Sequence, residues 1–288
     1  RVNPVYLPNV RLPQGVSPSS DLEKVVHGKK IIFLVVPSKT MREVVCKIKP
    51  YLSADACLVS AAKGLEPGSM FRMSEIIGQV LPDFKGRIAV VSGPNHAEEV
   101  SRGIPTATVV AAKRREIAEF VQEVLTTSTF RVYTNPDMIG VELGGALKNI
   151  IAVGAGALNG IGFGDNAIAA LLTRGLAEIT RLGVSLGADP ITFMGLSGVG
   201  DLIVTGTSVH SRNWRAGKLI GEGRDLESIH EEIGMAIEGL STVIAAKELA
   251  EDSNIEMPIT QAIYEVVYEG ADVSETILEL MRREGKAE

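Results

Sequence analysis

Short apolar runs alternate with amphipathic stretches along the first half of the chain. Runs rich in apolar and β-branched residues predict strands at 30–36, 58–62, 87–91, 106–112 and 130–133. Amphipathic spacing between them predicts helices at 40–48, 69–81 and 116–125. Strands that are apolar on both faces and alternate with helices are typical of a parallel sheet covered on both sides. The first half is therefore predicted to be an α/β domain.

The pattern changes after Asn135 and Pro136, which suit the cap and the first position of a helix. Beyond this point only helical periodicity remains, at 137–158, 167–186, 212–220, 226–233, 242–251, 260–269 and 273–284. We therefore expect an α/β domain at residues 1–136 and an all-α domain at residues 137–288. The proline-rich first twenty residues show no periodicity and predict a loop.

Three successive predicted strands end in small or polar residues. Their tips are Val36-Pro37-Ser38, Ala62-Lys63-Gly64 and Ser92-Gly93-Pro94-Asn95. In open parallel sheets, ligands bind outside the carboxyl ends of the strands. A glycine or proline after one strand is usually only a turn, but three such tips together indicate a ligand site at this edge of the sheet.

One glycine-rich apolar segment, residues 140–164, carries Lys148 as its only charge between Glu142 and Asp165. Each glycine weakens a helix by about 0.5–1 kcal/mol relative to alanine, so the repeated glycines indicate a second helix or a cofactor close to the backbone. Burial disfavours a charged amine, which makes an interior lysine a candidate for chemistry. Two other interpretations fit: a membrane-spanning helix, which the glycines and the lysine disfavour, and a core helix whose lysine reaches the surface.

A second informative segment, residues 195–217, combines glycines with polar side chains. Asp201 follows a glycine-rich loop and precedes an apolar run, so we expect it on the first turn of a helix, with Thr205 one turn later on the same face. Ser211, Arg212 and Asn213 offer a hydroxyl, a guanidinium and an amide, which together suit a phosphate or a carboxylate. The alternatives are ordinary helix caps for Asp201 and Ser211 and a solvated side chain for Arg212.

Charge and composition exclude several classes of protein. Lysine plus arginine total 29 and aspartate plus glutamate total 35, so the net charge is −6 and nucleic acid is not an expected partner. Cys46 and Cys57 show no metal or redox spacing and the histidines form no H-x-x-x-H pair, so no metal site is expected. The sequence shows no charged-then-apolar leader, which predicts a cytoplasmic protein with free thiols and no membrane insertion.

A dinucleotide site has a glycine fingerprint of its own, G-x-G-x-x-G/A between a strand and a helix. The match in this sequence runs from Gly162 to Ala167, and it follows a predicted helix instead of a strand. We therefore interpret it as a false positive. Either the protein binds no dinucleotide, or the first βαβ unit precedes Arg1.

Several long motifs resemble the bacterial NAD(P)-dependent glycerol-3-phosphate dehydrogenases. They are A-K-G-L-E at 62–66, G-P-N-H-A at 93–97, G-V-E-L-G-G-A-L-K-N-I-I-A-V-G-A-G at 140–156, G-A-D-P-I-T-F-M-G-L-S-G-V-G-D-L at 187–202, S-R-N at 211–213 and M-P-I-T at 257–260. The resemblance extends over essentially the whole chain. It implies a Rossmann-type parallel-sheet domain followed by an all-helical substrate domain. Residues 3–13 resemble the family's loop after its second strand, so the Rossmann domain is expected to be incomplete in this chain.

The resemblance also implies roles for individual residues. Lys148 matches the family's catalytic proton donor and acceptor. The positions that match substrate ligands are Lys63, Gly93, Asn95, Lys148, Asp201, Ser211, Arg212 and Asn213. Those that match cofactor contacts are Lys63, Ala97, Arg212, Ala236 and Glu238, and Asn149 and Thr205 match supporting positions.

The implied activity is the interconversion of sn-glycerol 3-phosphate and dihydroxyacetone phosphate with NAD or NADP, which supplies glycerol 3-phosphate for phospholipid synthesis. The resemblance also implies a homodimer, while the choice between NAD and NADP stays open. Two alternatives remain: a reductase of another small oxo acid, and a non-catalytic fragment that acts as an oligomerising helical domain. Because the pyrophosphate cradle is missing from residues 1–288, we expect this chain alone to bind NADH weakly or not at all.

Overall fold

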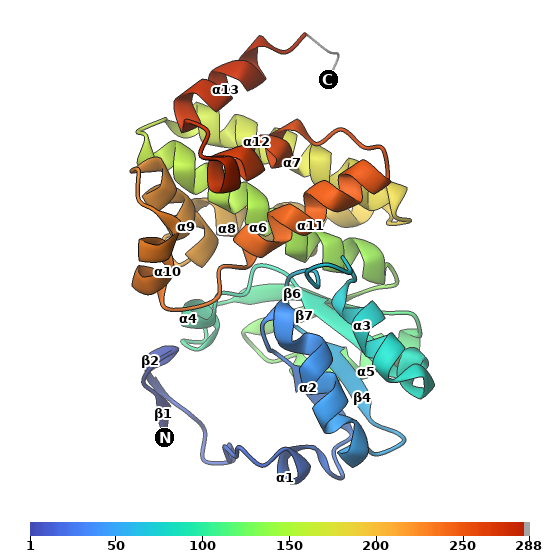
Figure 1. The fold of residues 1–288 in the computed structure, drawn as a ribbon. Helices are drawn as coiled ribbons and strands as arrows, with labels where there is room; N and C mark the ends of the chain where they lie inside the picture. Colours follow the sequence, from blue (N-terminus) through green and yellow to red (C-terminus); the bar gives the residue numbers. More distant parts are fainter. Residues whose placement is uncertain (285–288) are drawn as a thin grey trace.

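The computed structural model describes residues 1–284 and has two parts, a sheet covered by helices and an all-helical part stacked above it (Figure 1). The chain completes the sheet before it enters the helical part. The last strand ends at Asn135 and the first long helix begins at Met138.

The central sheet has five strands in the order β3-β4-β5-β6-β7. Their bounds are β3 (Ile31–Leu34), β4 (Cys57–Ser60), β5 (Ile88–Ser92), β6 (Thr106–Ala112) and β7 (Phe130–Asn135). The neighbouring strands pair in parallel except β5 and β6, which are antiparallel. The prediction of a wholly parallel sheet is therefore wrong at this one pair. A parallel return needs a crossover that spans the sheet, whereas the link from β5 to β6 holds only the short helix α4 (Ala97–Val100) and turns back at the same edge.

Helices cover both faces of this sheet. They are α1 (Leu22–Val26), α2 (Met41–Ile48), α3 (Met73–Val80) and α5 (Arg115–Leu125). Val45 and Ile76 share one core cluster with Leu58, while Val121 shares another with Val59. Because successive side chains of a strand point to opposite faces, this alternation shows α2 and α3 on one face and α5 on the other. The apolar run of β4 is explained by burial on both sides.

The helix predicted at 69–81 is shorter than expected. It begins at Met73, because Gly68 and Met70 both adopt positive φ angles, 81° and 59°. Such a left-handed conformation at a non-glycine residue is uncommon and interrupts a helix.

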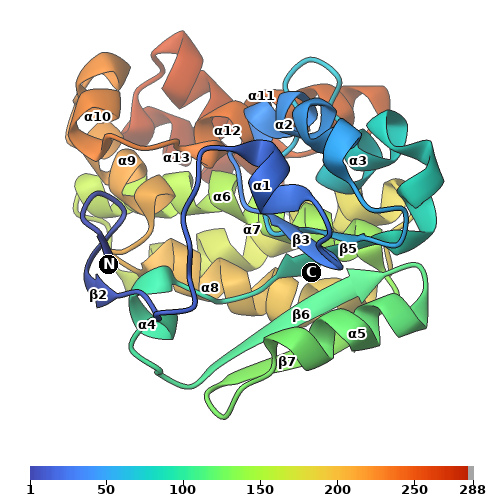
Figure 2. The same cartoon turned by 90° about the horizontal axis from the view of Figure 1, so that it is seen from below.

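The first residues form a hairpin where a loop was predicted. β1 (Val2–Asn3) pairs antiparallel with β2 (Leu7–Arg11), and the hairpin lies beside α4 in both ribbon views (Figures 1 and 2). The Asn3 side chain accepts hydrogen bonds from the backbone amides of Val5 and Tyr6 and so closes the turn. Turn closure by an asparagine side chain was the signal that the proline-based prediction overlooked.

The helical part is built around one long central helix, α6 (Met138–Gly160). The others are α7 (Asp165–Ser185), α8 (Asp201–Thr207), α9 (Arg212–Gly221), α10 (Leu226–Ile233), α11 (Glu238–Asp252), α12 (Pro258–Tyr264) and α13 (Val273–Arg282). The expected helices are confirmed within a few residues. The one predicted at 260–269 corresponds to α12 and a following π-helical turn at Glu265–Glu269.

Glycines let α6 and α9 approach backbone to backbone. A Cβ atom on Gly156 would meet the Trp214 carbonyl, and one on Gly217 would meet the Val153 carbonyl. The predicted second helix on the glycine face is therefore α9. By length and hydropathy α6 could cross a membrane, but 89% of its most apolar window is buried inside the protein. The glycine pattern reflects helix packing within the fold.

Candidate active site

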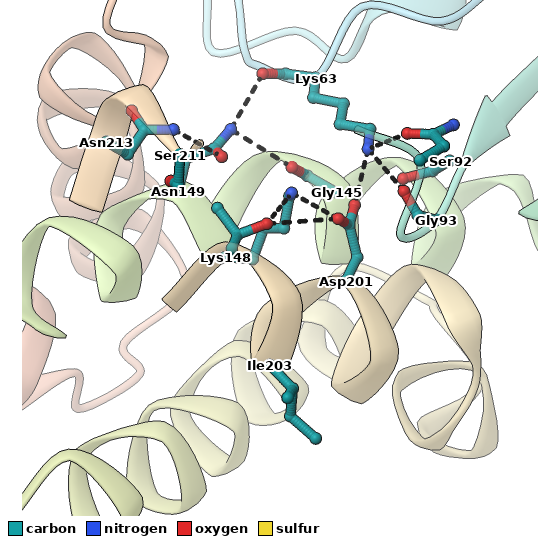
Figure 3. A network of polar contacts seen from close by, with 12 residues as sticks. Lys63, Ser92, Gly93, Gly145, Lys148, Asn149, Asp201, Ile203, Ser211 and Asn213 are labelled. Atoms are coloured by element: carbon teal, nitrogen blue, oxygen red, sulfur yellow. Dashed lines mark hydrogen bonds and ion pairs between the residues drawn. The ribbon is translucent and has the colours of Figure 1, made fainter. Parts of the chain in front are cut away.

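The carboxyl ends of β4 and β5 are joined by a lysine. Lys63 follows β4, and its ammonium donates to the Gly93 carbonyl at 2.8 Å, just beyond β5 (Figure 3). The same ammonium donates to Asn95 Oδ1 at 3.1 Å. Gly93 has a φ of +148°, and a Cβ atom there would lie 2.9 Å from the Thr108 hydroxyl. This position requires glycine, because the backbone conformation and the lack of space both exclude a side chain.

Lys148 and Asp201 form a buried ion pair beneath these strand ends. Lys148 Nζ donates to Asp201 Oδ1 at 2.6 Å and also to the Thr205 hydroxyl. Lys148 is 4% exposed and Asp201 is 2% exposed, so the lysine does not reach the surface. Asp201 is the first residue of α8, and Thr205 lies one turn later on the same face, as the spacing predicted.

A close approach of α6 to the turn before α8 creates this geometry. A Cβ atom on Gly144 would lie 2.6 Å from the Ser197 carbonyl oxygen, and one on Gly145 would collide with the Ser92 hydroxyl. Gly144 and Gly145 lie one helical turn before Lys148. Because they lack side chains, the segment that precedes α8 packs against Gly144 and the tip of β5 packs against Gly145.

The Asp201 carboxylate is shared by two lysines. Lys63 Nζ donates to Asp201 Oδ2 at 2.8 Å, while Lys148 occupies Oδ1 (Figure 3). Lys63 belongs to the sheet part and Lys148 to the helical part, so one carboxylate connects the two. A buried carboxylate is stable only with such partners.

Burial and neighbouring charge shift the acidities of this cluster. Burial lowers the pKa of Lys148 to about 8, against the raising effect of Asp201 and with a further lowering by the Lys63 charge. Burial would raise the pKa of Asp201, but the Lys148 and Lys63 ammonium groups outweigh it and the pKa falls. A lysine with a pKa near neutrality can both donate and accept a proton at physiological pH.

Two asparagines extend the network to α9 and α11. Asn149 Nδ2 donates to the Lys63 carbonyl at 3.3 Å, and its Oδ1 accepts from Asn213 Nδ2 at 2.8 Å. Asn213 Oδ1 in turn accepts from the Gly239 amide at 2.8 Å. Asn213 therefore holds Asn149, and one hydrogen on its Nδ2 has no partner among residues 1–284 and is available to a ligand.

Ser211 and Arg212 lie at the start of α9. The Ser211 hydroxyl accepts a hydrogen bond from the Trp214 amide at 3.2 Å. Ser211 therefore caps α9, which confirms the helix-cap alternative from the sequence analysis. Its hydroxyl proton can still be donated. The exposed Arg212 donates to the Ala236 carbonyl at 2.9 Å, which brings two of the matched cofactor positions together.

Glu238 contacts the end of β3, which no sequence pattern indicated. Its carboxylate accepts hydrogen bonds from the amide and the hydroxyl of Ser38. Sequence reasoning did not indicate this contact, although Ser38 stands in one of the three polar strand tips. Ala97 begins α4, the short helix that follows the tip of β5.

Within residues 1–284, several buried polar atoms near the strand tips have no hydrogen-bond partner. They include the hydroxyls of Ser60 and Ser92, at the ends of β4 and β5, and Nε2 of His96. Buried polar groups are normally satisfied, so exceptions at a strand edge are typical of a site completed by a ligand. The residues present therefore fit a ligand rich in hydrogen-bonding groups, such as a nucleotide. Among residues 1–284, no group of three or more His, Cys, Asp or Glu could hold a metal ion.

A sheet whose strand ends face a buried lysine on an all-helical domain is the architecture of a two-domain α/β enzyme, and the family models identify its class as the dehydrogenases. The model of the NAD-dependent glycerol-3-phosphate dehydrogenase N-terminus matches residues 1–118, and that of the C-terminus matches residues 137–278. The chain belongs to the NAD-dependent glycerol-3-phosphate dehydrogenase family.

Individual relatives agree with this assignment. A curated glycerol-3-phosphate dehydrogenase [NAD(P)+] of Lactiplantibacillus plantarum is 51% identical over 290 residues, which cover 99% of this chain and 86% of the relative. One from Bacillus cereus is 52% identical over 287 residues, with 99% and 84% covered. The crystal structure of glycerol-3-phosphate dehydrogenase from Coxiella burnetii has a TM-score of 0.93 at 39% identity and covers 98% of this chain and 86% of that one.

More distant structures show the fold alone. A PanE/ApbA family ketopantoate reductase from Ralstonia eutropha has a TM-score of 0.55 at 14% identity. The shared architecture therefore extends beyond the family, while the sequence identity does not.

Proposed function

We propose that the protein interconverts sn-glycerol 3-phosphate and dihydroxyacetone phosphate with NAD or NADP. Curated relatives named glycerol-3-phosphate dehydrogenase [NAD(P)+] are 51% and 52% identical in sequence over 99% of this chain. The observation that carries the chemical part of the proposal is the buried Lys148–Asp201 pair at the ends of the strands. A hydroxyl–carbonyl interconversion needs one group that moves a proton, and this pair supplies it.

Lys148 is the proposed proton carrier. In the reductive direction its ammonium donates a proton to the developing alkoxide oxygen, and in the oxidative direction its neutral amine removes the proton from the hydroxyl. Asp201 and Thr205 hold the amine from two sides, so its direction is fixed before the reaction begins.

The phosphate of the substrate is proposed to lie between the start of α9 and the strand tips. Arg212 and Asn213 would bind it through a guanidinium and an amide, with the Ser211 hydroxyl beside them. Gly93 and Asn95 would border it from the β5 side, and Lys63 would contribute charge. These contacts fix the distance between the reacting carbon and Lys148.

The cofactor is proposed to lie along the same edge of the sheet. The residues proposed to bind NAD or NADP are Lys63, Ala97, Arg212, Ala236 and Glu238. The bound nicotinamide would supply or accept the hydride. Asn149 supports this arrangement, because it ties the Lys63 backbone to α6. The proposal divides the protein into a nucleotide-binding domain at residues 1–136 and a substrate domain at residues 137–288.

The test is an assay of the full-length protein with dihydroxyacetone phosphate and NADH or NADPH. We expect cofactor oxidation that saturates with dihydroxyacetone phosphate and negligible turnover of 2-oxo acids such as ketopantoate. If the protein turned over a 2-oxo acid faster than dihydroxyacetone phosphate, the protein would be a reductase of 2-oxo acids and this proposal would be wrong. The ratio of rates with the two cofactors gives the preference between NAD and NADP.

We also propose a cytoplasmic homodimer that supplies glycerol 3-phosphate for phospholipid synthesis. Curated bacterial relatives named glycerol-3-phosphate dehydrogenase [NAD(P)+] support glycerol 3-phosphate as a product. Exposed apolar side chains such as Leu278 and Met281 on α13 are available for a subunit contact. Sedimentation equilibrium tests the dimer, and a monomer at micromolar concentration would contradict it.

A further inference from the structure

Ser38 and Glu238 form a contact between the two parts of the molecule, although 200 positions separate them in the sequence. The Ser38 amide donates to Glu238 Oε1 at 3.1 Å and the Ser38 hydroxyl donates to Oε2 at 2.5 Å. Ser38 is 2% exposed. Both oxygens of the carboxylate are therefore held by a single buried residue of the sheet domain.

We infer that Ser38 is a positioning residue that locks the Glu238 carboxylate in place for binding of the nicotinamide nucleotide. This inference rests on the proposed function, because it assumes that Glu238 contacts the cofactor. It adds Ser38, the last residue of the Val36-Pro37-Ser38 tip, to the machinery of the site.

Local structure explains why Ser38 has a free amide to offer. Ser38 begins a 3₁₀ turn (Ser38–Thr40) that continues into α2, and the preceding Pro37 supplies no side-chain cap. The Thr40 hydroxyl donates back to the Pro37 carbonyl at 2.9 Å and leaves the Ser38 amide untouched. The first amides of a helical turn lack internal acceptors. Glu238 of the other domain provides the acceptor.

Gly64 closes over this pair. A Cβ atom on Gly64 would lie 2.7 Å from the Ser38 hydroxyl and 2.8 Å from Glu238 Oε2. The tip of β4 is therefore in direct contact with the Ser38–Glu238 pair. The residue before Gly64 is Lys63, which binds Asp201.

The other side of the pair also leads to the lysine cluster. The residue after Glu238 is Gly239, whose amide donates to Asn213, and Asn213 donates to Asn149. Asn149 is adjacent in sequence to Lys148. Each neighbour of the pair is thus joined to the lysine cluster through two hydrogen-bonded contacts, so the pair borders the site without touching Lys148.

A locked carboxylate is a better ligand than a mobile one. A carboxylate has about four acceptor positions, and Ser38 occupies two of them. The remaining two can accept hydrogen bonds from ribose hydroxyls or from the carboxamide of a nicotinamide. Because Glu238 is already ordered, binding does not have to fix its side chain, and the affinity is higher.

The test compares Ser38→Ala, Glu238→Gln and the double variant in the full-length protein. Dissociation constants for NADH are measured by fluorescence titration, and kcat and KM by the steady-state assay. We expect Ser38→Ala to raise the dissociation constant and the KM for NADH about ten-fold each, while kcat falls less than about two-fold. Because both single variants break the same contact, the double variant should bind no more weakly than the weaker single variant.

Thr40→Ala is the matched control. It removes a hydroxyl from the same turn but leaves the Ser38–Glu238 contact, so its NADH affinity should equal that of the unaltered protein. Three outcomes would each overturn the inference. The NADH dissociation constant of Ser38→Ala could lie within about two-fold of that of the unaltered protein, or Thr40→Ala could weaken NADH binding equally. The fold-changes of the two single variants could also multiply in the double variant. NADH binding is read without turnover, so a protein that binds NADH but ignores dihydroxyacetone phosphate would sink the proposed function and leave this result standing.

Discussion

The Lys148 ammonium lies 2.6 Å from the Asp201 carboxylate, and both side chains are almost completely buried. Moving such a pair out of water is costly, and a buried pair is seldom the most stable solution for a protein core. Its presence at the ends of the strands is therefore better explained by chemistry than by stability.

Replacing Lys148 by alanine should abolish catalysis while sparing the phosphate contacts. Loss of the proton carrier is expected to lower kcat roughly 10²–10⁴-fold. Binding of glycerol 3-phosphate, measured by calorimetry, should change far less, because Arg212 and Asn213 remain. Lys29→Ala, at an exposed position, serves as the control. A Lys148→Ala protein with normal turnover would remove the assignment.

Replacing Arg212 by alanine should affect substrate saturation more than the chemical step. Loss of a guanidinium that binds phosphate typically costs several kcal/mol, so KM for dihydroxyacetone phosphate should rise about 10²-fold or more. Initial rates over a range of substrate concentrations give the value. Arg215→Ala on the same helix is the comparison. Unchanged saturation in Arg212→Ala would refute the phosphate role.

The two directions of the reaction should depend on pH in opposite ways. Burial lowers the pKa of Lys148 to about 8, so the amine is mainly charged below that pH and mainly neutral above it. Oxidation needs the neutral base and should speed up as pH rises through about 8, whereas reduction needs the ammonium and should slow down. Profiles of kcat in both directions test this, and two flat profiles would contradict it.

Charge changes around Lys148 should move these profiles in opposite directions. Asp201 raises the pKa of Lys148 and Lys63 lowers it. Asp201→Asn should therefore shift the midpoint to lower pH, and Lys63→Met should shift it to higher pH. The residual activity of each variant is measured against pH. A shift of both midpoints in the same direction would show that another group titrates.

The contact between α6 and α9 should not tolerate a methyl group. In Gly217→Ala the new Cβ would meet the Val153 carbonyl, so the helices must separate. Overpacking of this kind costs about 3 kcal/mol, which thermal unfolding would register as a lower Tm. No atom of residues 1–284 lies within 4 Å of the Cβ position of Gly15, so Gly15→Ala should leave the Tm nearly unchanged. An equal Tm for both variants would contradict the packing argument.

Local patterns predicted much of this molecule because they act over a few residues. A buried Lys148 was one of three interpretations of the glycine-rich segment and is the one that the structure confirms, and the shared face of Asp201 and Thr205 followed from their spacing. The order of sheet and helical parts followed from the change in periodicity near Pro136.

Contacts between distant residues could not be obtained in this way. Nothing in the sequence links Ser38 to Glu238 or Asn213 to Gly239, because each contact depends on how the two parts meet. The antiparallel turn from β5 to β6 was also missed, since apolar strands look alike in either direction. The hairpin at β1 and β2 was hidden by prolines that suggested a loop.

The net charge of the triad Lys63, Asp201 and Lys148 is positive, whereas the net charge of the whole protein is negative. Two ammonium groups around one carboxylate leave an excess of one positive charge, inside a chain whose net charge is −6. Field lines in a low-dielectric recess are concentrated toward such a centre. A small phosphorylated molecule would thus be drawn to this point, although the protein as a whole carries a negative charge. Added salt should weaken this guidance and slow its capture.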